Sequence, residues 1–189
     1  MRTMKVKEAI IIFLMIGIMA VVAGCARGPT GPGETNYQLK ITVEVAGEIN
    51  TDEGIYYVVL DADSESIDGP VADINFWDDE YYYIKLENDF FSFAQVKDEV
   101  ESTFYGGSFS GNKLQATIAL SDLGNPNSID INVITTDLDN NNYDYLDEGY
   151  FTISTEIGSE VTQSDSPDDS GEGEINFNLL EVYADISIL

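Results

Sequence analysis

The sequence predicts an all-β protein, a single antiparallel β-sandwich of the jelly-roll or immunoglobulin-like kind that follows an N-terminal signal helix and a flexible tether. From residue 37 onward, apolar side chains recur mainly at every second position, which is the spacing of strands with one buried face. Short polar turns separate these runs, and no run has the helical period of a parallel crossover. These observations favour about eight to ten antiparallel strands.

The expected strands can be placed along the chain in order. Residues 37–45 alternate apolar and polar side chains, whereas residues 55–60 are apolar on both faces, as in a central strand. A short turn is expected over residues 119–125, and the acidic stretch 158–173 is expected to be a polar loop. Further strands are expected at residues 90–96, 128–135, 149–155 and 180–188.

Two hairpins are predicted, and a Gly-Asn turn at residues 111–112 forms the first. In its register Phe109 pairs with Leu114, and Tyr105 pairs with Ile118.

The second hairpin is expected around the acidic residues 78–80. A three-residue loop there pairs Trp77 with Tyr81, and the same register places Tyr83 on their face. These rings could form a flat stacking platform for a sugar, with Asn75 bonding its hydroxyl groups. The alternative is that a loop or the second sheet covers this face, or that the rings only pack against each other across strands.

The first 24 residues have the features of a secretory signal. Basic residues precede an apolar run over residues 9–22, which is too short to span a bilayer core of about 30 Å comfortably. Val22, Ala23 and Gly24 then precede Cys25, and this tetrapeptide resembles the lipobox of bacterial lipoproteins. The resemblance implies cleavage after Gly24 and diacylation of the Cys25 thiol, which would anchor the protein in a lipid bilayer. An uncleaved anchor or a chance cysteine is the alternative.

We therefore expect three parts in the chain. They are a lipoprotein signal peptide over residues 1–24, the lipidated cysteine with a Gly/Pro linker over residues 25–36, and the sandwich domain over residues 37–189. The protein is expected to be exported and membrane-anchored. If the cell has two membranes, the lipobox resemblance implies the outer membrane or the cell surface, because Ala26 and Arg27 follow Cys25 and no aspartate does.

Composition excludes several kinds of chemistry. Residues 1–24 hold three of the eight basic and one of the 35 acidic residues, which leaves five basic and 34 acidic residues after them. Such a surface repels nucleic acid. The chain has no histidine, all four methionines lie in residues 1–24, and Cys25 is the single cysteine. We expect no haem, zinc or copper and no disulfide within the chain, whereas oxygen-ligated cations and carboxylate chemistry remain.

Two acidic stretches carry the ligand types of a calcium site. The first matches positions 1, 3, 5, 7 and 12 of an EF-hand loop, although Asn142 stands where that loop has glycine. Its residues are Asp137, Asp139, Asn141, Tyr143 through its carbonyl oxygen, and Glu148. The second candidate cluster is Asp61, Asp63, Glu65 and Asp68. In so acidic a chain these spacings also arise by chance, so a solvated loop is the alternative in both places.

Four short stretches carry a family resemblance, at residues 54–63, 68–70, 110–114 and 120–124. Their sequences, GIYYVVLDAD, DGP, SGNKL and LSDLG, resemble the β-sandwich superfamily of DOMON domains and family 9 carbohydrate-binding modules. The haem-binding branch uses His and Met ligands that residues 25–189 lack, so the resemblance implies a sugar-binding or uncharacterised member. Family 9 modules clamp a sugar between two tryptophans, whereas Trp77 is the only tryptophan here.

The functional expectation is a lipoprotein of the cell envelope that displays an acidic, non-catalytic binding module for a glycan-type ligand, with calcium as a candidate cofactor. Its partners would be the bilayer, through acylated Cys25, and a polysaccharide or an envelope protein. A structural or protein-interaction lipoprotein without a small-molecule ligand is the alternative. A carboxylate-based hydrolase is the third class, but no spacing singles out two acids, and we expect no enzyme activity.

Overall fold

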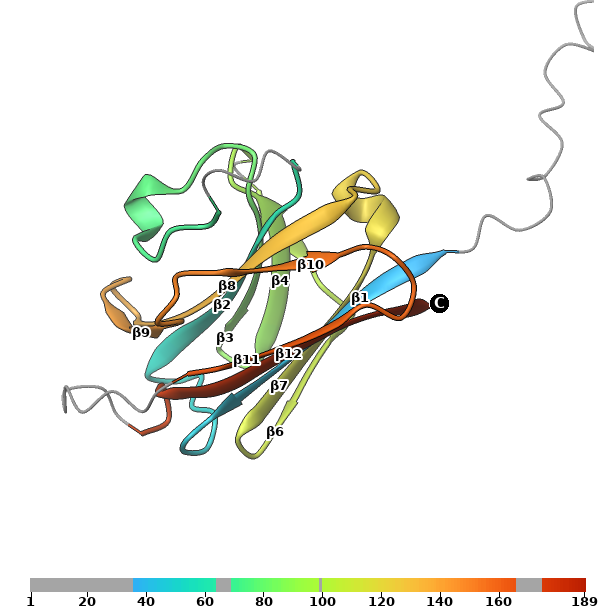
Figure 1. The fold of residues 1–189 in the computed structure, drawn as a ribbon. Helices are drawn as coiled ribbons and strands as arrows, with labels where there is room; N and C mark the ends of the chain where they lie inside the picture. The colour runs from blue at the N-terminus through green and yellow to red at the C-terminus, as the bar shows by residue number, and fades with distance from the viewer. Residues whose placement is uncertain (1–35, 64–68, 99, 166–174) are drawn as a thin grey trace, which may run out of the picture. The chain divides into compact units, whose positions relative to one another are not determined.

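The computed structural model describes residues 36–63, 69–98, 100–165 and 175–189. The signal segment, the lipobox with Cys25 and the linker up to residue 35 lie outside the described residues. Residues Asn36–Leu189 form one unit built from two antiparallel sheets that pack face to face (Figure 1). The prediction of an all-β sandwich is confirmed.

The two sheets contain the following strands. The smaller sheet has the order β11 (Glu160–Ser164), β12 (Leu179–Ile188), β1 (Tyr37–Val45), β7 (Lys113–Ala119) and β6 (Gly107–Ser110). The larger sheet has the order β10 (Phe151–Ser154), β8 (Ser128–Asp137), β2 (Gly54–Asp61), β3 (Tyr82–Glu87), β4 (Phe90–Gln95) and β5 (Ser102–Thr103), and β9 (Asn142–Tyr145) pairs with β8. Two single 3₁₀ turns are η1 (Ile74–Phe76) and η2 (Leu120–Leu123).

The core lies between the sheets and is built from alternate residues of the facing strands. In β1, Leu39, Ile41, Val43 and Val45 are fully buried, whereas their polar neighbours are partly exposed. Burying one such side chain stabilises the fold by about 1.5–3 kcal/mol. The alternation predicted for residues 37–45 is therefore confirmed.

β2 lies between β8 and β3 in the larger sheet, and it is buried on both faces because one face packs in the core and the other lies under a second apolar cluster. This confirms the central strand predicted for residues 55–60. The core-facing side chains are Tyr56, Val58 and Leu60, and the outward-facing ones are Ile55, Tyr57 and Val59.

Four other predicted strands match β4, β8, β10 and β12. The predicted turn at residues 119–125 matches η2, which Gly124 ends in the left-handed conformation at φ 81°. Part of the stretch 158–173, expected to be a loop, forms β11 instead. β11 pairs with β12 at the edge of the smaller sheet and is largely polar, so its own sequence carries little strand signal.

The first predicted hairpin is correct close to its turn and wrong further away. Phe109 pairs with Leu114 as expected, but Tyr105 lies outside β6 and is 92% exposed. The reason is that the chain changes sheets here. The Phe104 amide donates to Phe91 of the larger sheet, whereas Gly107 already pairs with β7 of the smaller one.

The second predicted hairpin is wrong. Residues 74–76 form η1 instead of a strand, because the Asp73 carboxylate accepts the Asn75 amide and caps that turn. β3 pairs with β2 and β4, so Tyr83 lies opposite Val59 and Ala94. The apolar strand β2 therefore takes the place that the local hairpin would have filled.

Candidate functional site

The candidate site lies on the face of the larger sheet that points away from the core. A second cluster of buried apolar side chains is found there, separate from the core: Ile55, Tyr57, Val59, Tyr81 and Ile134. A sheet face turned to water normally carries polar residues, so an apolar face of this kind needs a cover or a ligand.

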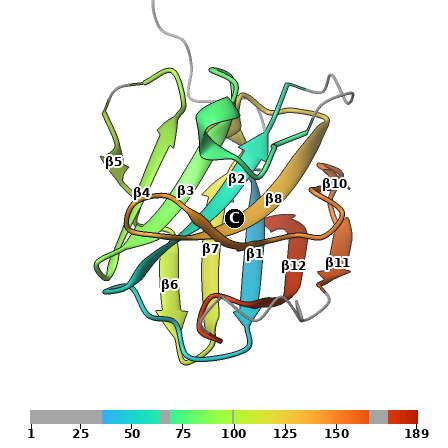
Figure 2. The same ribbon diagram turned by 90° about the vertical axis from the view of Figure 1, so that its left-hand side faces the viewer.

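Residues 69–80 supply part of that cover. Figure 2 shows this segment, with its η1 turn, in front of the larger sheet. From β8, Asn132 donates its Nδ2 to the Pro70 carbonyl oxygen at 2.9 Å. The Tyr81 hydroxyl donates to the Gly69 carbonyl oxygen at 3.3 Å. The segment is thus fastened to the sheet at the end where it enters this face.

At its other end the segment presents Trp77 to two tyrosine rings. The ring centroids of Trp77 and Tyr57 lie 5.3 Å apart in an edge-on contact, and those of Trp77 and Tyr83 lie 5.7 Å apart with an interplanar angle of 41°. The Trp77 indole Nε1 donates to the Val71 carbonyl oxygen at 2.9 Å, which fixes the ring's edge. Tyr57 is buried, whereas Trp77 and Tyr83 are half-buried and offer ring surface to solvent.

A polar network borders these rings. Glu101 accepts the Tyr83 hydroxyl at 3.1 Å and the Ser92 hydroxyl at 2.7 Å, and forms an ion pair with Lys85 at 2.7 Å. Lys85 also pairs with Glu87 at 3.2 Å. Burial opposes the charge on Glu101, but the hydrogen bonds from Lys85 and Ser92 outweigh it and lower the pKa of this carboxyl group. Burial and the Glu101 charge raise the pKa of Tyr83 to about 12, so its hydroxyl stays a donor.

The structure brings two of the four predicted platform residues together, Trp77 and Tyr83. Tyr81 is buried beneath the cover, and Asn75 lies on η1 with its side chain bonded to Asp73. The rings are inclined to each other, so the surface is angled and not the flat platform expected from a continuous strand. Sequence reasoning missed Tyr57, Lys85 and Glu101, because only the pairing of β2, β3, β4 and β5 shows that they meet.

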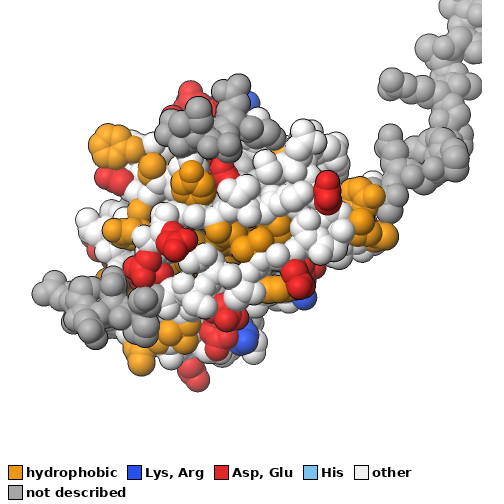
Figure 3. All heavy atoms as spheres, in the orientation of Figure 1, with side chains coloured by type: hydrophobic (Ala, Val, Ile, Leu, Met, Phe, Trp, Pro, Cys, Tyr) orange, Lys and Arg blue, Asp and Glu red, His pale blue; other side chains and the backbone are white. Residues whose placement is uncertain are grey.

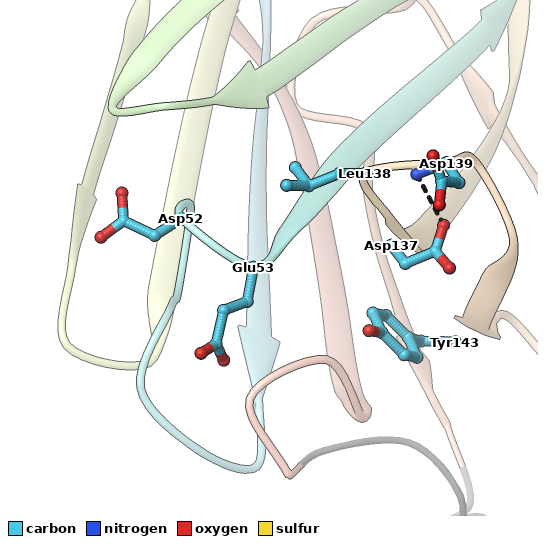
Figure 4. Close-up of a pocket in the computed structure, with 6 residues that line it drawn as sticks. All are labelled: Asp52, Glu53, Asp137, Leu138, Asp139 and Tyr143. Atoms are coloured by element: carbon cyan, nitrogen blue, oxygen red, sulfur yellow. Dashed lines mark hydrogen bonds between the residues drawn. The ribbon is translucent and has the colours of Figure 1, made fainter.

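The first calcium stretch borders an open hollow of about 380 Å³ (Figure 4). The hollow is lined by Asp52, Glu53, Asp137, Leu138, Asp139 and Tyr143. Figure 4 shows the carboxylates of Asp52 and Glu53 turned away from Asp137. Glu148 follows β9 and does not line the hollow. Within the described ranges, no group of three or more His, Cys, Asp or Glu side chains is placed to hold a metal ion.

Asp137 instead organises the loop that it begins. Its carboxylate accepts the backbone amides of Asp139 and Asn141, both at 2.8 Å, and the Asn141 Nδ2 at 2.7 Å. The hydrogen bonds from Asn141 lower the pKa of Asp137. The loop therefore has a local structural explanation, whether or not a cation binds beside it.

The second calcium cluster is only partly described. Asp61 ends β2 and is buried, and it accepts the Asp63 amide at 3.1 Å. Glu65 and Asp68 lie outside the described residues. The residue directly opposite Asp61 is Asp130 of β8, which is also buried and accepts the Thr152 hydroxyl. Sequence reasoning missed Asp130, because no local spacing relates it to Asp61.

Comparison of the chain with protein-family models, with curated proteins and with solved structures finds no match. In the part of the chain that the structure describes, no helix is both long enough and apolar enough to cross a membrane. The fold and the outer face define the class of this protein as a β-sandwich with a partly covered aromatic surface on one sheet.

Proposed function

We propose that this chain is an exported, lipid-anchored binding module of a cell envelope, and that it holds a glycan-type ligand on the outer face of its larger sheet. The observation that carries the proposal is the half-buried pair Trp77 and Tyr83, beside the network of Lys85, Glu101 and Ser92. Sugars offer apolar C–H faces to aromatic rings and hydroxyl groups to charged or polar side chains. Both kinds of partner are adjacent here.

Charge limits the class of glycan. The formal net charge is −27, and Figure 3 shows acidic side chains spread over the visible face with few basic ones among them. Lys85, the one basic residue in the network, is already paired with Glu87 and Glu101. Sulfated or uronic acid polymers would be repelled, so the proposed ligand is a neutral or amino-bearing glycan.

The anchor part of the proposal rests on the lipobox resemblance at Cys25. Acylation of this residue would tie the sandwich to a bilayer, and residues 26–36 would act as the spacer. Metabolic labelling with a fatty acid tests it, since the Cys25→Ser variant should lose the label and accumulate with its signal uncleaved. Recovery of Cys25→Ser in the lipidated fraction would overturn this part.

The binding part is tested with Trp77→Ala and Tyr83→Ala against a panel of neutral and amino-bearing polysaccharides. Each variant should weaken retention of a bound polysaccharide by about tenfold or more, because each removes one stacking ring. Tyr105→Ala is the matched control, since Tyr105 is 92% exposed and lies outside this face. A wild-type protein that retains nothing from the panel, or ring variants that bind as well as the control, would refute the glycan proposal.

Tyr83→Phe separates ring stacking from the polar network. It keeps the ring and removes only the hydroxyl that donates to Glu101. If stacking dominates, Tyr83→Phe should retain most of the affinity that Tyr83→Ala loses. Melting temperatures of all variants show whether a loss reflects the surface or the fold.

A further inference from the structure

A buried, acceptor-rich row of side chains lies on the same outer face, at the end of β2 away from Tyr57. Asp61 and Asp130 are direct partners in the β2–β8 ladder, and both are 6% exposed. Side chains directly opposite each other in such a ladder have Cβ atoms about 4.5–5.5 Å apart. Two carboxylates are therefore held close together in a place that water hardly reaches.

The neighbouring residue along β8 has an unsatisfied oxygen. Asn132 lies two residues from Asp130, so its side chain is on the same face. It is fully buried and donates its Nδ2 to the Pro70 carbonyl oxygen, but no described residue donates a hydrogen bond to its Oδ1. A buried amide oxygen without a partner costs about 1–3 kcal/mol, so an unsatisfied acceptor on the same face as two carboxylates is a candidate ligand for a cation.

Among the described residues, no lysine or arginine forms an ion pair with this row. Within the described residues, the ion pairs of Lys85 and Lys113 are made with glutamates elsewhere, and none involves Asp61 or Asp130. Two like charges buried together are unstable unless a proton or a metal ion joins them. A shared divalent cation would relieve the repulsion between Asp61 and Asp130.

We propose that Asp61, Asp130 and the Oδ1 of Asn132 form a binding site for a hard divalent cation, Ca²⁺ in preference to Mg²⁺. All three supply oxygen ligands, and two carboxylates that bind in bidentate fashion plus one amide oxygen would provide five of the six to eight that Ca²⁺ takes. Mg²⁺ requires near-ideal octahedral geometry and retains several waters, for which a buried sheet face has little room.

Residues 69–80, the covering segment, contact this row through Asn132. A side chain at Gly69 would meet the Tyr150 ring at 2.5 Å, so the backbone of the segment lies directly against that ring. Next to it, Pro70 is bonded to Asn132 itself. The same segment leads to Trp77, whose indole is bonded to Val71. A cation bound by Asn132 would thus order the segment that presents Trp77 to the proposed glycan surface.

Thermal unfolding of the purified protein tests the site. The melting temperature is compared in chelator, in Ca²⁺ and in Mg²⁺, at constant ionic strength near pH 7.5. Ca²⁺ at about a hundred times its dissociation constant should raise the melting temperature of a domain of this size by about 5–10 °C, and Mg²⁺ should raise it less. The absence of any Ca²⁺-dependent shift in the wild-type protein would overturn the proposal.

Isosteric variants locate the effect. Asp61→Asn and Asp130→Asn should each abolish the Ca²⁺-dependent shift, and in chelator each should melt at or above the wild-type temperature, because the repulsion is relieved. Asp137→Asn, in the exposed loop, is the matched control and should keep the full shift. Loss of the shift in Asp137→Asn, with retention in the other two, would place the ion in the loop and refute the site.

A second measurement does not depend on unfolding. Trp77 is the only tryptophan in the chain, so its fluorescence reports on the covering segment in the folded protein. Titration with Ca²⁺ should change this signal with a single-site curve in the wild-type protein and in Asp137→Asn, and not in Asp61→Asn. An identical response in all three proteins would contradict the assignment. Both readouts are independent of any glycan, so this site can fail while the proposed function stands.

Discussion

Asp61 should make the cation-free protein less stable as pH rises, and the structure sets the size of the effect. Burial, with repulsion from Asp63 and Asp130, raises its pKa from 3.8 to about 6. The native state therefore holds this proton more tightly than the unfolded state does. The resulting stabilisation is fully present below pH 3.8 and is lost as pH rises through about 6.

The magnitude follows from the pKa difference. At 1.36 kcal/mol per pKa unit, the whole window is worth at most about 3 kcal/mol. The sequence pI is about 4.1, so measurements should stay above it to keep the protein soluble. Between about pH 5 and pH 7.5 the loss is then at most about 1.4 kcal/mol, and screening by water at the rim of the site reduces it to about 1 kcal/mol.

Urea unfolding of the wild-type protein and of Asp61→Asn in chelator measures this effect. Carboxylates with lowered pKa values, such as Glu101 and Asp137, change stability in the opposite direction, but they do so equally in both proteins. The difference in the free energy of unfolding between the two proteins isolates Asp61. It should shift by about 1 kcal/mol in favour of Asp61→Asn as pH rises. Parallel pH profiles would refute the reasoning.

Three further substitutions test the fold and the network. Gly107→Ala should destabilise the protein by about 1–3 kcal/mol in urea unfolding, because the new Cβ would lie 2.3 Å from the Phe91 ring. Asp144→Asn should cost about 1–3 kcal/mol, because the two oxygens of the buried carboxylate accept the Tyr145 amide at 2.8 Å and the Leu179 amide at 2.7 Å, and an asparagine could accept only one of them. Lys85→Met should cost about 1–2 kcal/mol at neutral pH and less at low pH, because it leaves both glutamate partners unpaired.

Each of these has a matched control. Ser108→Ala changes an exposed neighbour of Gly107 in β6 and should stay within about 0.5 kcal/mol of wild type. Asp139→Asn is the control for Asp144→Asn, because it removes an exposed carboxylate and not a buried one. Lys113→Met is the control for Lys85→Met, because its ion pair with Glu44 is more exposed. If a control costs as much as its partner, the effect comes from net charge or composition and not from the named contact.

Local patterns predicted those parts of the fold that depend on near neighbours in the chain. The alternation in β1, the double-sided burial of β2 and the Gly124 turn each follow from side chains within a few residues of one another. The aromatic residues Trp77 and Tyr83 were also identified. Their arrangement was not, because η1 removes Trp77 from the strand and tilts its ring toward Tyr83.

The sequence by itself determined the acidic composition, the lack of histidine and the alternating apolar pattern that forms a two-sheet β protein. The tertiary structure decided which residues share a face. Asp61 and Asp130 are far apart in the chain and meet only because β2 pairs with β8 in one register. Which strands pair depends on the burial of whole sheet faces, and these faces are built from residues that are distant in the chain. The arrangement of both proposed sites therefore follows only from the tertiary structure.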